Sequence, residues 1–279
     1  MKRTISVLVV LLLAASLAFA GGGKEPAAKI TKLADLEGKV VAALSGPQDP
    51  EMIRALVAQQ TGVMFKDMLF FDTYMAAIAA LKSNKVDSVL VFGPMLNYNA
   101  SRDASLGVIN LSPVGTSTIH MAVRATDAEL RSNINAALIS MKNDGTLAKL
   151  EKEFVTDLKP SQQLAGKNMP RFNGAPTLVV GLSGDGAPVD YVAADGKPAG
   201  YNVELLALLA EKLNVNFEIS VLPNESKFPA LASNKIDIFF LHFVNSDAEV
   251  IMKTLETNSN ATLTEPYYEF TEWGYLVLK

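Results

Sequence analysis

The feature that most constrains the fold of this chain is an internal repeat. Residues 81–87, Leu-Lys-Ser-Asn-Lys-Val-Asp, return as residues 231–237, Leu-Ala-Ser-Asn-Lys-Ile-Asp, and an apolar run follows each copy. A second pair of similar runs lies upstream in the same order, at residues 40–46 and 179–184. Short, continuously apolar runs are typical of parallel strands that are buried on both faces. Two pairs of repeated segments in the same order indicate two lobes of similar design.

Amphipathic patterns separate the paired apolar runs. One begins after Asp49 and Pro50, which suit the cap and the first position of a helix, and it ends at Gly62. Its counterpart runs from Asn202 to Asn214. Each half therefore predicts the order strand, helix, strand, helix, strand, and the fold class is α/β.

A third block, residues 116–154, has a different pattern. It predicts a strand over residues 119–123, a helix that Gly145 ends, and a short second helix that ends near Phe154. Residues 157–176 are punctuated by Pro and Gly and lack apolar periodicity, so we interpret them as a linker.

Composition excludes several function classes. The 279 residues carry 25 basic and 29 acidic side chains, a formal charge of −4, which argues against the basic surface of a nucleic-acid-binding protein. The absence of Cys excludes disulfides, thiolate nucleophiles and Cys-ligated zinc. Only His120 and His242 are present, far apart and without a ligand pattern. We expect no metal site and no cofactor.

The first twenty residues have the pattern of a signal peptide. A basic start at Lys2 and Arg3 precedes an apolar core and a small-x-small cleavage site at residues 18–20. The apolar stretch is short for a membrane span, although a retained anchor is the alternative. No Cys follows for lipid attachment. We expect residues 1–20 to be removed and the protein to be exported to a periplasm.

Several motifs resemble bacterial extracellular solute-binding proteins of family 3, the periplasmic amino-acid-binding proteins of ABC importers. Residues 36–41 and 81–87 are similar to the family's second lobe, and residues 116–154 are similar to its C-terminal segment, which returns to the first lobe. The segments that resemble the family's N-terminal lobe are residues 177–181, 195–205, 231–237 and 265–268. The resemblance implies a two-lobe periplasmic-binding-protein fold of type II.

The order of the lobes is reversed relative to the family, so the chain reads as a circular permutant. The predicted divisions are lobe 2 at 33–115, the C-terminal segment at 116–156, the linker at 157–176 and lobe 1 at 177–279. About 20 linker residues span ~25 Å as a coil, enough to join termini that lie close together. The alternative to a closed monomer is a domain-swapped dimer.

Circular permutation would also cut one of the two crossings between the lobes. Its halves are residues 275–279 and 31–36, and the crossing at residues 112–118 stays covalent. We expect residues 275–278 to pair as a strand beside the intact crossing, because four apolar residues would otherwise be exposed.

The resemblance implies a ligand clamped between the lobes, but the family's amino-acid clamp is not conserved in this chain. The position of the carboxylate-binding Arg falls on Glu249, and that of the ammonium-binding Asp falls on Phe92. The Gly-Thr pair of the second lobe appears as Gly46 and Pro47. An α-carboxylate would be repelled at Glu249, so we expect standard L-amino acids to bind weakly or not at all.

Other side chains at the same strand ends are the candidate ligand contacts. Each also has a structural interpretation: the serines can satisfy loop backbone, Asp185 can be a turn residue, and His242 can be a core imidazole. The candidates are Ser45, Gln48, Phe92, Ser183, Asp185, Tyr191, His242 and Asn245. We assign no catalytic residue.

Three functions compete. The first is a transport receptor that captures a small solute and delivers it to an ABC permease. The second is a sensory or protein-interacting binding module. The third is an enzyme, since cyclohexadienyl dehydratases and some lytic transglycosylases share the fold; only Asp185 and Glu249 are placed to act as a general acid. We favour the transport receptor and expect no enzymatic activity.

Overall fold

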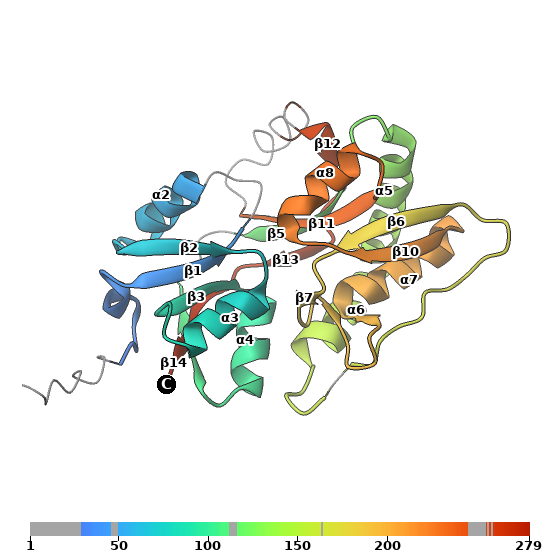
Figure 1. Ribbon diagram of the computed structural model, residues 1–279. Helices are drawn as coiled ribbons and strands as arrows, with labels where there is room; N and C mark the ends of the chain where they lie inside the picture. Colours follow the sequence, from blue (N-terminus) through green and yellow to red (C-terminus); the bar gives the residue numbers. More distant parts are fainter. Residues whose placement is uncertain are drawn as a thin grey trace, which may run out of the picture.

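The chain folds into two α/β lobes, each built on its own sheet (Figure 1). The computed structural model describes residues 29–45, 50–111, 116–162, 164–244, 255, 257 and 259–279. The predicted signal peptide, Asp49, and residues 112–115 of the predicted crossing lie outside the described residues. No helix in the described ranges combines the length and hydropathy needed to cross a bilayer.

Lobe 2 contains the sheet with strand order β2-β1-β3-β14-β4. Its strands are β1 (Val40–Leu44), β2 (Asp67–Phe71), β3 (Ser88–Phe92), β4 (Leu106–Asn110) and β14 (Trp273–Leu278). Its helices are η1 (Leu33–Leu36), α2 (Pro50–Thr61), α3 (Tyr74–Lys82) and α4 (Gly93–Arg102).

Lobe 1 contains the sheet with order β10-β6-β11-β5-β12, and β13 also pairs with β5. Its strands are β5 (Ser117–Arg124), β6 (Thr177–Leu182), β10 (Asn216–Val221), β11 (Ile238–Val244), β12 (Ala261–Leu263) and β13 (Tyr268–Phe270). Its helices are α5 (Ala128–Asn143), α6 (Thr146–Glu151), η2 (Lys152–Thr156), α7 (Tyr201–Leu213), η3 (Asn224–Ser226) and α8 (Lys227–Ala232). A small sheet joins β7 (Asp185–Gly186), β8 (Asp190–Val192) and β9 (Pro198–Ala199).

The two main sheets share one topology. In each, the lobe's first strand lies between its second and third strands, which run parallel to it. An antiparallel strand from a distant segment then pairs with the third: β14 with β3, and β5 with β11. The two lobes therefore have the same α/β design, as the internal repeat predicted.

The repeated aspartate has the same backbone contacts in both lobes. The Asp87 carboxylate accepts the Val40 N–H at 2.8 Å, and the Asp237 carboxylate accepts the Val179 N–H at 2.8 Å. Each aspartate N–H donates in turn to the carbonyl of the same valine, at 2.7 Å. The repeated Asp, just before the third strand of each lobe, therefore binds the first strand: at its first residue in lobe 2 and at its third residue in lobe 1.

The repeated asparagine ends the preceding helix. Asn84 and Asn234 have φ values of 56° and 58°, in the left-handed region that Asn tolerates better than other non-glycine residues. This conformation reverses the chain after α3 and after α8, so that the next residues enter a strand. The internal repeat therefore encodes a helix-to-strand connection.

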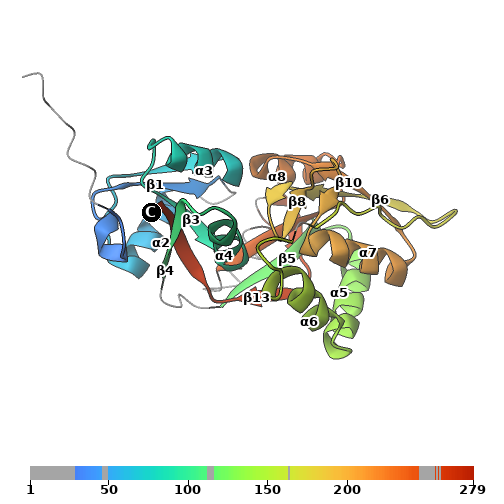
Figure 2. The same ribbon diagram turned by 90° about the horizontal axis from the view of Figure 1, so that it is seen from below.

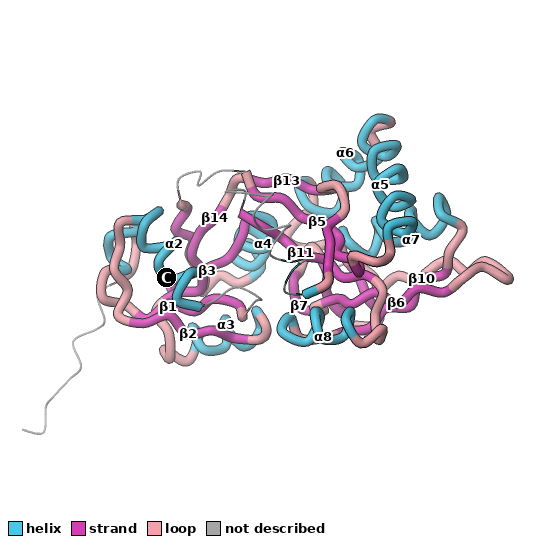
Figure 3. Tube along the Cα trace, turned by 90° about the horizontal axis from the view of Figure 1, so that it is seen from above, coloured by secondary structure: helices cyan, strands magenta, loops and turns pink. Residues whose placement is uncertain are grey.

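Strand β14, from the C-terminal end of the chain, lies inside lobe 2 (Figure 2). It pairs with both β3 and β4, and Tyr275 and Leu276 are 0% exposed. Residues 275–278 form a strand as expected, but the expected neighbour is wrong: β14 pairs with β3 and β4, and it is β13 that pairs with residues 117–119 of β5. Together β14 and β13 run from one lobe to the other, and β13 continues beside β5 (Figure 3).

The third block follows the predicted order of elements. The strand expected at residues 119–123 is β5, Gly145 at φ 79° follows α5, and α6 continues as a π-helical turn to Thr156. The described part of residues 157–176 contains neither helix nor strand. The Asn216 side chain accepts the Phe172 N–H at 2.8 Å, which holds this segment against lobe 1.

Candidate functional site

The two lobes touch where the sequence predicted a cleft. The Asp185 carboxylate, on β7 of lobe 1, accepts the backbone N–H groups of Tyr74 at 2.5 Å and Met75 at 3.4 Å. These residues form the first turn of α3 in lobe 2, where free N–H groups and the helix dipole favour an anion. Burial raises the pKa of Asp185, and the two N–H groups oppose that rise. Asp185 therefore occupies an anion position at the lobe boundary.

Behind Asp185 lies a buried lysine that sequence reasoning missed. Lys227 is 4% exposed, and its Nζ donates to Ser183 Oγ at 2.7 Å. Burial lowers the pKa of Lys227, while Asp190 and Asp185 raise it. The internal repeat could have identified this lysine. At the repeat offset of 150 residues, Lys227 corresponds to Ala77, which is 0% exposed in the core of α3, so a lysine at this position is expected to be buried.

Tyr191 lies at the same boundary. Burial raises the pKa of Tyr191 to about 12, with Tyr98 of α4 adding to the rise and a hydrogen bond from the Leu164 backbone opposing it. Three of the predicted candidates therefore lie on the lobe 1 side of the boundary. Asp185 binds α3 of lobe 2, Tyr191 lies near Tyr98 of α4 in lobe 2, and Ser183 binds Lys227 within lobe 1.

Phe92 is part of an aromatic cluster. Its ring is 6% exposed and lies 6.2 Å from Tyr74, 5.2 Å from Phe270 and 6.3 Å from Trp273, between ring centroids. The position that holds the ammonium-binding Asp in the resembled family is here surrounded by rings.

The remaining sequence candidates are placed only in part. The Ser45 N–H donates to the Phe71 carbonyl at 2.8 Å at the end of β1. His242 lies on β11 in register with Ile119. Gln48, Asn245, the pair Gly46 and Pro47, and Glu249 lie outside the described residues. Ligand contact by the eight candidates stays a prediction.

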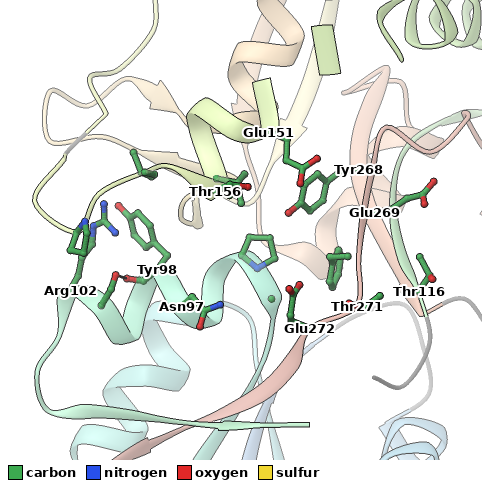
Figure 4. Close-up of a pocket in the computed structure, with 17 residues that line it drawn as sticks. Asn97, Tyr98, Arg102, Thr116, Glu151, Thr156, Tyr268, Glu269, Thr271 and Glu272 are labelled. Carbon is green, nitrogen blue, oxygen red and sulfur yellow. Dashed lines mark hydrogen bonds between the residues drawn. The ribbon is translucent and has the colours of Figure 1, made fainter. Parts of the chain in front are cut away.

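A pocket of about 640 Å3 lies at a different part of the lobe boundary (Figure 4). Its walls come from α4 of lobe 2, from α6 and η2 of lobe 1, and from the turn between β13 and β14. The lining residues are Gly93, Pro94, Asn97, Tyr98, Ser101, Arg102, Thr116, Glu151, Val155, Thr156, Leu158, Pro160, Tyr268, Glu269, Phe270, Thr271 and Glu272. We call it the interlobe pocket.

Two carboxylates and a phenol converge in the interlobe pocket (Figure 4). Burial, followed by the nearby charge of Glu272, raises the pKa of Glu151. Burial also raises the pKa of Tyr268, and the charges of Glu151 and Glu272 add to the rise. Tyr268 is 7% exposed, and its hydroxyl has no hydrogen-bond partner among the described residues.

A glycine makes room for Glu272. The Gly93 N–H donates to the Glu272 carbonyl at 2.7 Å, and a Cβ at Gly93 would lie 3.0 Å from Glu272 Oε2. The absence of a side chain at the first residue of α4 therefore lets the Glu272 carboxylate lie against that helix.

At the other end of the interlobe pocket, Arg102 binds backbone through Nη2, while its Nη1 is buried without a hydrogen-bond partner among the described residues. Its guanidinium lies 3.6 Å from the centroid of the Tyr98 ring, and Nη2 donates to the carbonyls of Lys159 and Gln162 at 2.9 and 2.8 Å. Arg102 thereby fastens the start of the 157–176 segment to lobe 2.

The described residues contain no grouping of three or more His, Asp or Glu side chains that could hold a metal ion.

Two family models match complementary parts of the sequence. Residues 178–272 match the bacterial extracellular solute-binding proteins, family 3, and residues 23–140 match the model described as NMT1/THI5 like. No curated protein sequence matches the chain.

Solved structures are similar at low identity. The ligand-binding component of an ABC-type import system from Staphylococcus aureus, solved with zinc, is 8% identical with a TM-score of 0.46; the match covers 86% of this chain and 65% of that one. An ancestral arginine-binding protein bound to arginine is 14% identical, with a TM-score of 0.45 and coverage of 88% and 86%. The GluR0 ligand-binding core from Nostoc punctiforme, in complex with L-glutamate, is 12% identical, with a TM-score of 0.41 and coverage of 86% and 85%. At these scores, nothing about ligand or activity follows.

Proposed function

We propose that the chain, whose residues 178–272 match the bacterial extracellular solute-binding proteins of family 3, captures a small solute between its lobes for import by an ABC-type permease. Solute binding is the role at the level of the family. Export to a periplasm through a cleaved signal peptide at residues 1–20, and the permease as partner, are parts of the proposal.

The observation that carries the proposal is the interlobe pocket. Its 640 Å3 suit a small organic molecule, and both lobes contribute side chains to its wall. A ligand that contacts both lobes favours their closed arrangement by its differential affinity for that arrangement. A permease can distinguish a closed lobe pair from an open one, which is the physical basis of delivery.

We also propose the lobe divisions at 33–115, 116–156, 157–176 and 177–279, in circularly permuted order. The observation that supports this order is β14, which comes from the end of the chain and lies within a sheet otherwise built from residues 40–110. We propose that the chain is a monomer. Light scattering measures the molar mass in solution and distinguishes the monomer from a domain-swapped dimer.

A thermal-shift screen against sugars, amines, carboxylates, nucleosides, short peptides and the standard L-amino acids tests solute binding. At about 100 times its Kd, a ligand adds roughly 2.7 kcal/mol, or about 5–10 °C in a chain of this size. We expect at least one class to give such a shift. We expect standard L-amino acids to bind no more tightly than about 100 µM in calorimetry, because Phe92 is enclosed by rings and cannot pair with an ammonium group.

A specific observation favours the second function, a sensory or protein-interacting module. Asp185 holds the N-terminus of α3 in lobe 2, so the lobes contact each other through the protein's own side chains. If no solute class raises the melting temperature, solute capture is wrong and this second function replaces it.

A further inference from the structure

We propose that the interlobe pocket binds an organic cation of the amine class through Glu151, Glu272 and Tyr268. This inference rests on the proposed function, because it names the chemical class of the solute. The pocket differs from the strand-end positions that carry the amino-acid clamp in the resembled family, so the two sites make different predictions.

The first argument is the charge of the wall. Glu151, Glu269 and Glu272 line the interlobe pocket, against the single guanidinium of Arg102. Glu269 points away from the pocket, towards Lys142, whose Nζ lies 3.7 Å from it. Glu151 and Glu272 remain, directed into the pocket (Figure 4). Each would attract an ammonium group placed between them.

The second argument is the Tyr268 hydroxyl. Tyr268 is only 7% exposed, and its hydroxyl is directed into the interlobe pocket. No described residue forms a hydrogen bond with this hydroxyl. Because the hydroxyl faces the pocket without such a partner, its donor and acceptor positions are available to a ligand atom. The raised pKa of Tyr268 keeps the phenol neutral, and a neutral phenol oxygen accepts a hydrogen bond from an ammonium N–H.

The third argument concerns the choice between an amine and a metal ion. Calcium requires 6–8 oxygen ligands and magnesium requires a near-octahedral set. No group of three or more acidic or His side chains in the described ranges meets that need. The pocket wall also includes the apolar side chains of Pro94, Val155 and Leu158, which suit a hydrocarbon body.

The pocket carboxylates also connect binding to the lobes. Glu151 belongs to α6 in lobe 1, and Glu272 precedes β14, which lies in the sheet of lobe 2. Their charges repel each other, which contributes to the raised pKa of Glu151. A cation between them removes this repulsion and holds the two lobes together.

The pH dependence follows from Glu151. The titratable groups that face it are the Glu272 carboxylate, from the turn before β14, and the neutral phenols of Tyr268 on β13 and Tyr201 on α7. Because the free protein has a raised pKa at Glu151, a bound cation lowers that pKa and binding releases a proton. Affinity therefore falls as the pH decreases through the raised pKa of Glu151.

Calorimetry of the full mature chain with n-hexylamine, 1,4-diaminobutane, hexanoate and calcium chloride at low ionic strength tests the proposal. We expect an amine to bind and the other two probes not to bind. Glu151→Gln and Glu272→Gln should each weaken amine binding at least about tenfold. Glu153→Gln is the matched control, because Glu153 is exposed, lies two residues from Glu151 and does not line the pocket; its affinity should be unchanged.

The amine affinity of the wild type should fall as the pH is lowered through the raised pKa of Glu151, and that of Glu151→Gln should change less. Equal affinity of the wild type and both pocket variants would overturn the amine site. Stabilisation by an anionic or neutral solute and by no amine would also overturn it, while solute binding itself would stand. If no solute of any class binds, both the amine site and the proposed function are wrong.

Discussion

Asp237 forms an ion pair, whereas its repeat counterpart Asp87 forms none with the described residues. Arg124 Nη2, from β5, lies 2.6 Å from Asp237 Oδ1, and Arg124 also donates to the Ile236 carbonyl at 2.8 Å. The two side chains are 15% and 21% exposed. Arg124 thus ties the third block of the sequence to the repeated connection of lobe 1.

Replacing the repeated aspartates should have unequal effects. Asp237→Asn should lower the free energy of unfolding by about 1.5–3 kcal/mol, because it removes a charge-assisted hydrogen bond from Arg124, which keeps Asp127 as its other carboxylate partner at 2.8 Å. Asp87→Asn, the matched change in lobe 2, should cost only about 1 kcal/mol, since it weakens a single hydrogen bond. Urea unfolding measures both. Equal losses in the two variants would show that the Arg124 pair adds nothing.

At the scale of elements, β14 shows how an interior strand can come from the end of a chain. It has a strand on each side, and its central residues are fully buried. Removing residues 275–279 therefore takes away two rows of hydrogen bonds as well as apolar surface.

Deletion of residues 275–279 should lower the melting temperature by at least several degrees and increase the radius of gyration in small-angle scattering. The physical reason is that β3 and β4 lose their common neighbour. A truncated chain that melts and scatters like the full chain would contradict the role of β14.

A finer test of the same strand uses Tyr275. Its hydroxyl is buried and has no hydrogen-bond partner among the described residues. Tyr275→Phe should therefore be neutral or stabilise by up to about 1 kcal/mol, because the unpaired hydroxyl is removed and the ring stays. Tyr275→Ala should cost about 3–5 kcal/mol through the cavity it leaves. Thermal unfolding distinguishes these outcomes, and a large loss in Tyr275→Phe would reveal a hidden partner.

At the scale of the whole molecule, Asp185 sets how the lobes sit in the absence of a ligand. Its contact with the first turn of α3 joins β7 of lobe 1 to lobe 2 without a covalent link. Asp185→Ala should weaken that contact and give a larger radius of gyration in small-angle scattering. Glu211→Ala, an exposed change on α7, is the control and should leave the radius unchanged. Identical scattering from Asp185→Ala and the wild type would contradict this role.

Much of the fold could be predicted from the sequence because its signals are local. The repeat, the apolar runs and the helix ends at Gly145, Asn84 and Asn234 depend on neighbouring residues and on backbone conformation. These signals predicted two α/β lobes and a strand at residues 275–278. They did not predict that β14 lies between two strands, since the choice of neighbours in a sheet depends on how distant segments pack.

Most of the candidate site, in contrast to the fold, could not be predicted from the sequence. The sequence by itself determined that the amino-acid clamp is not conserved, because that conclusion needs only residue types at matched positions such as Phe92. Only the tertiary structure brought Glu151 and Glu272 together across 121 positions of sequence, directed Tyr268 between them, and buried Lys227 behind Asp185. Carboxylates on a helix surface and in a turn have no local pattern that marks a shared pocket. Their convergence follows from the packing of α6 and the β13–β14 turn around α4, which is a property of the assembled lobes.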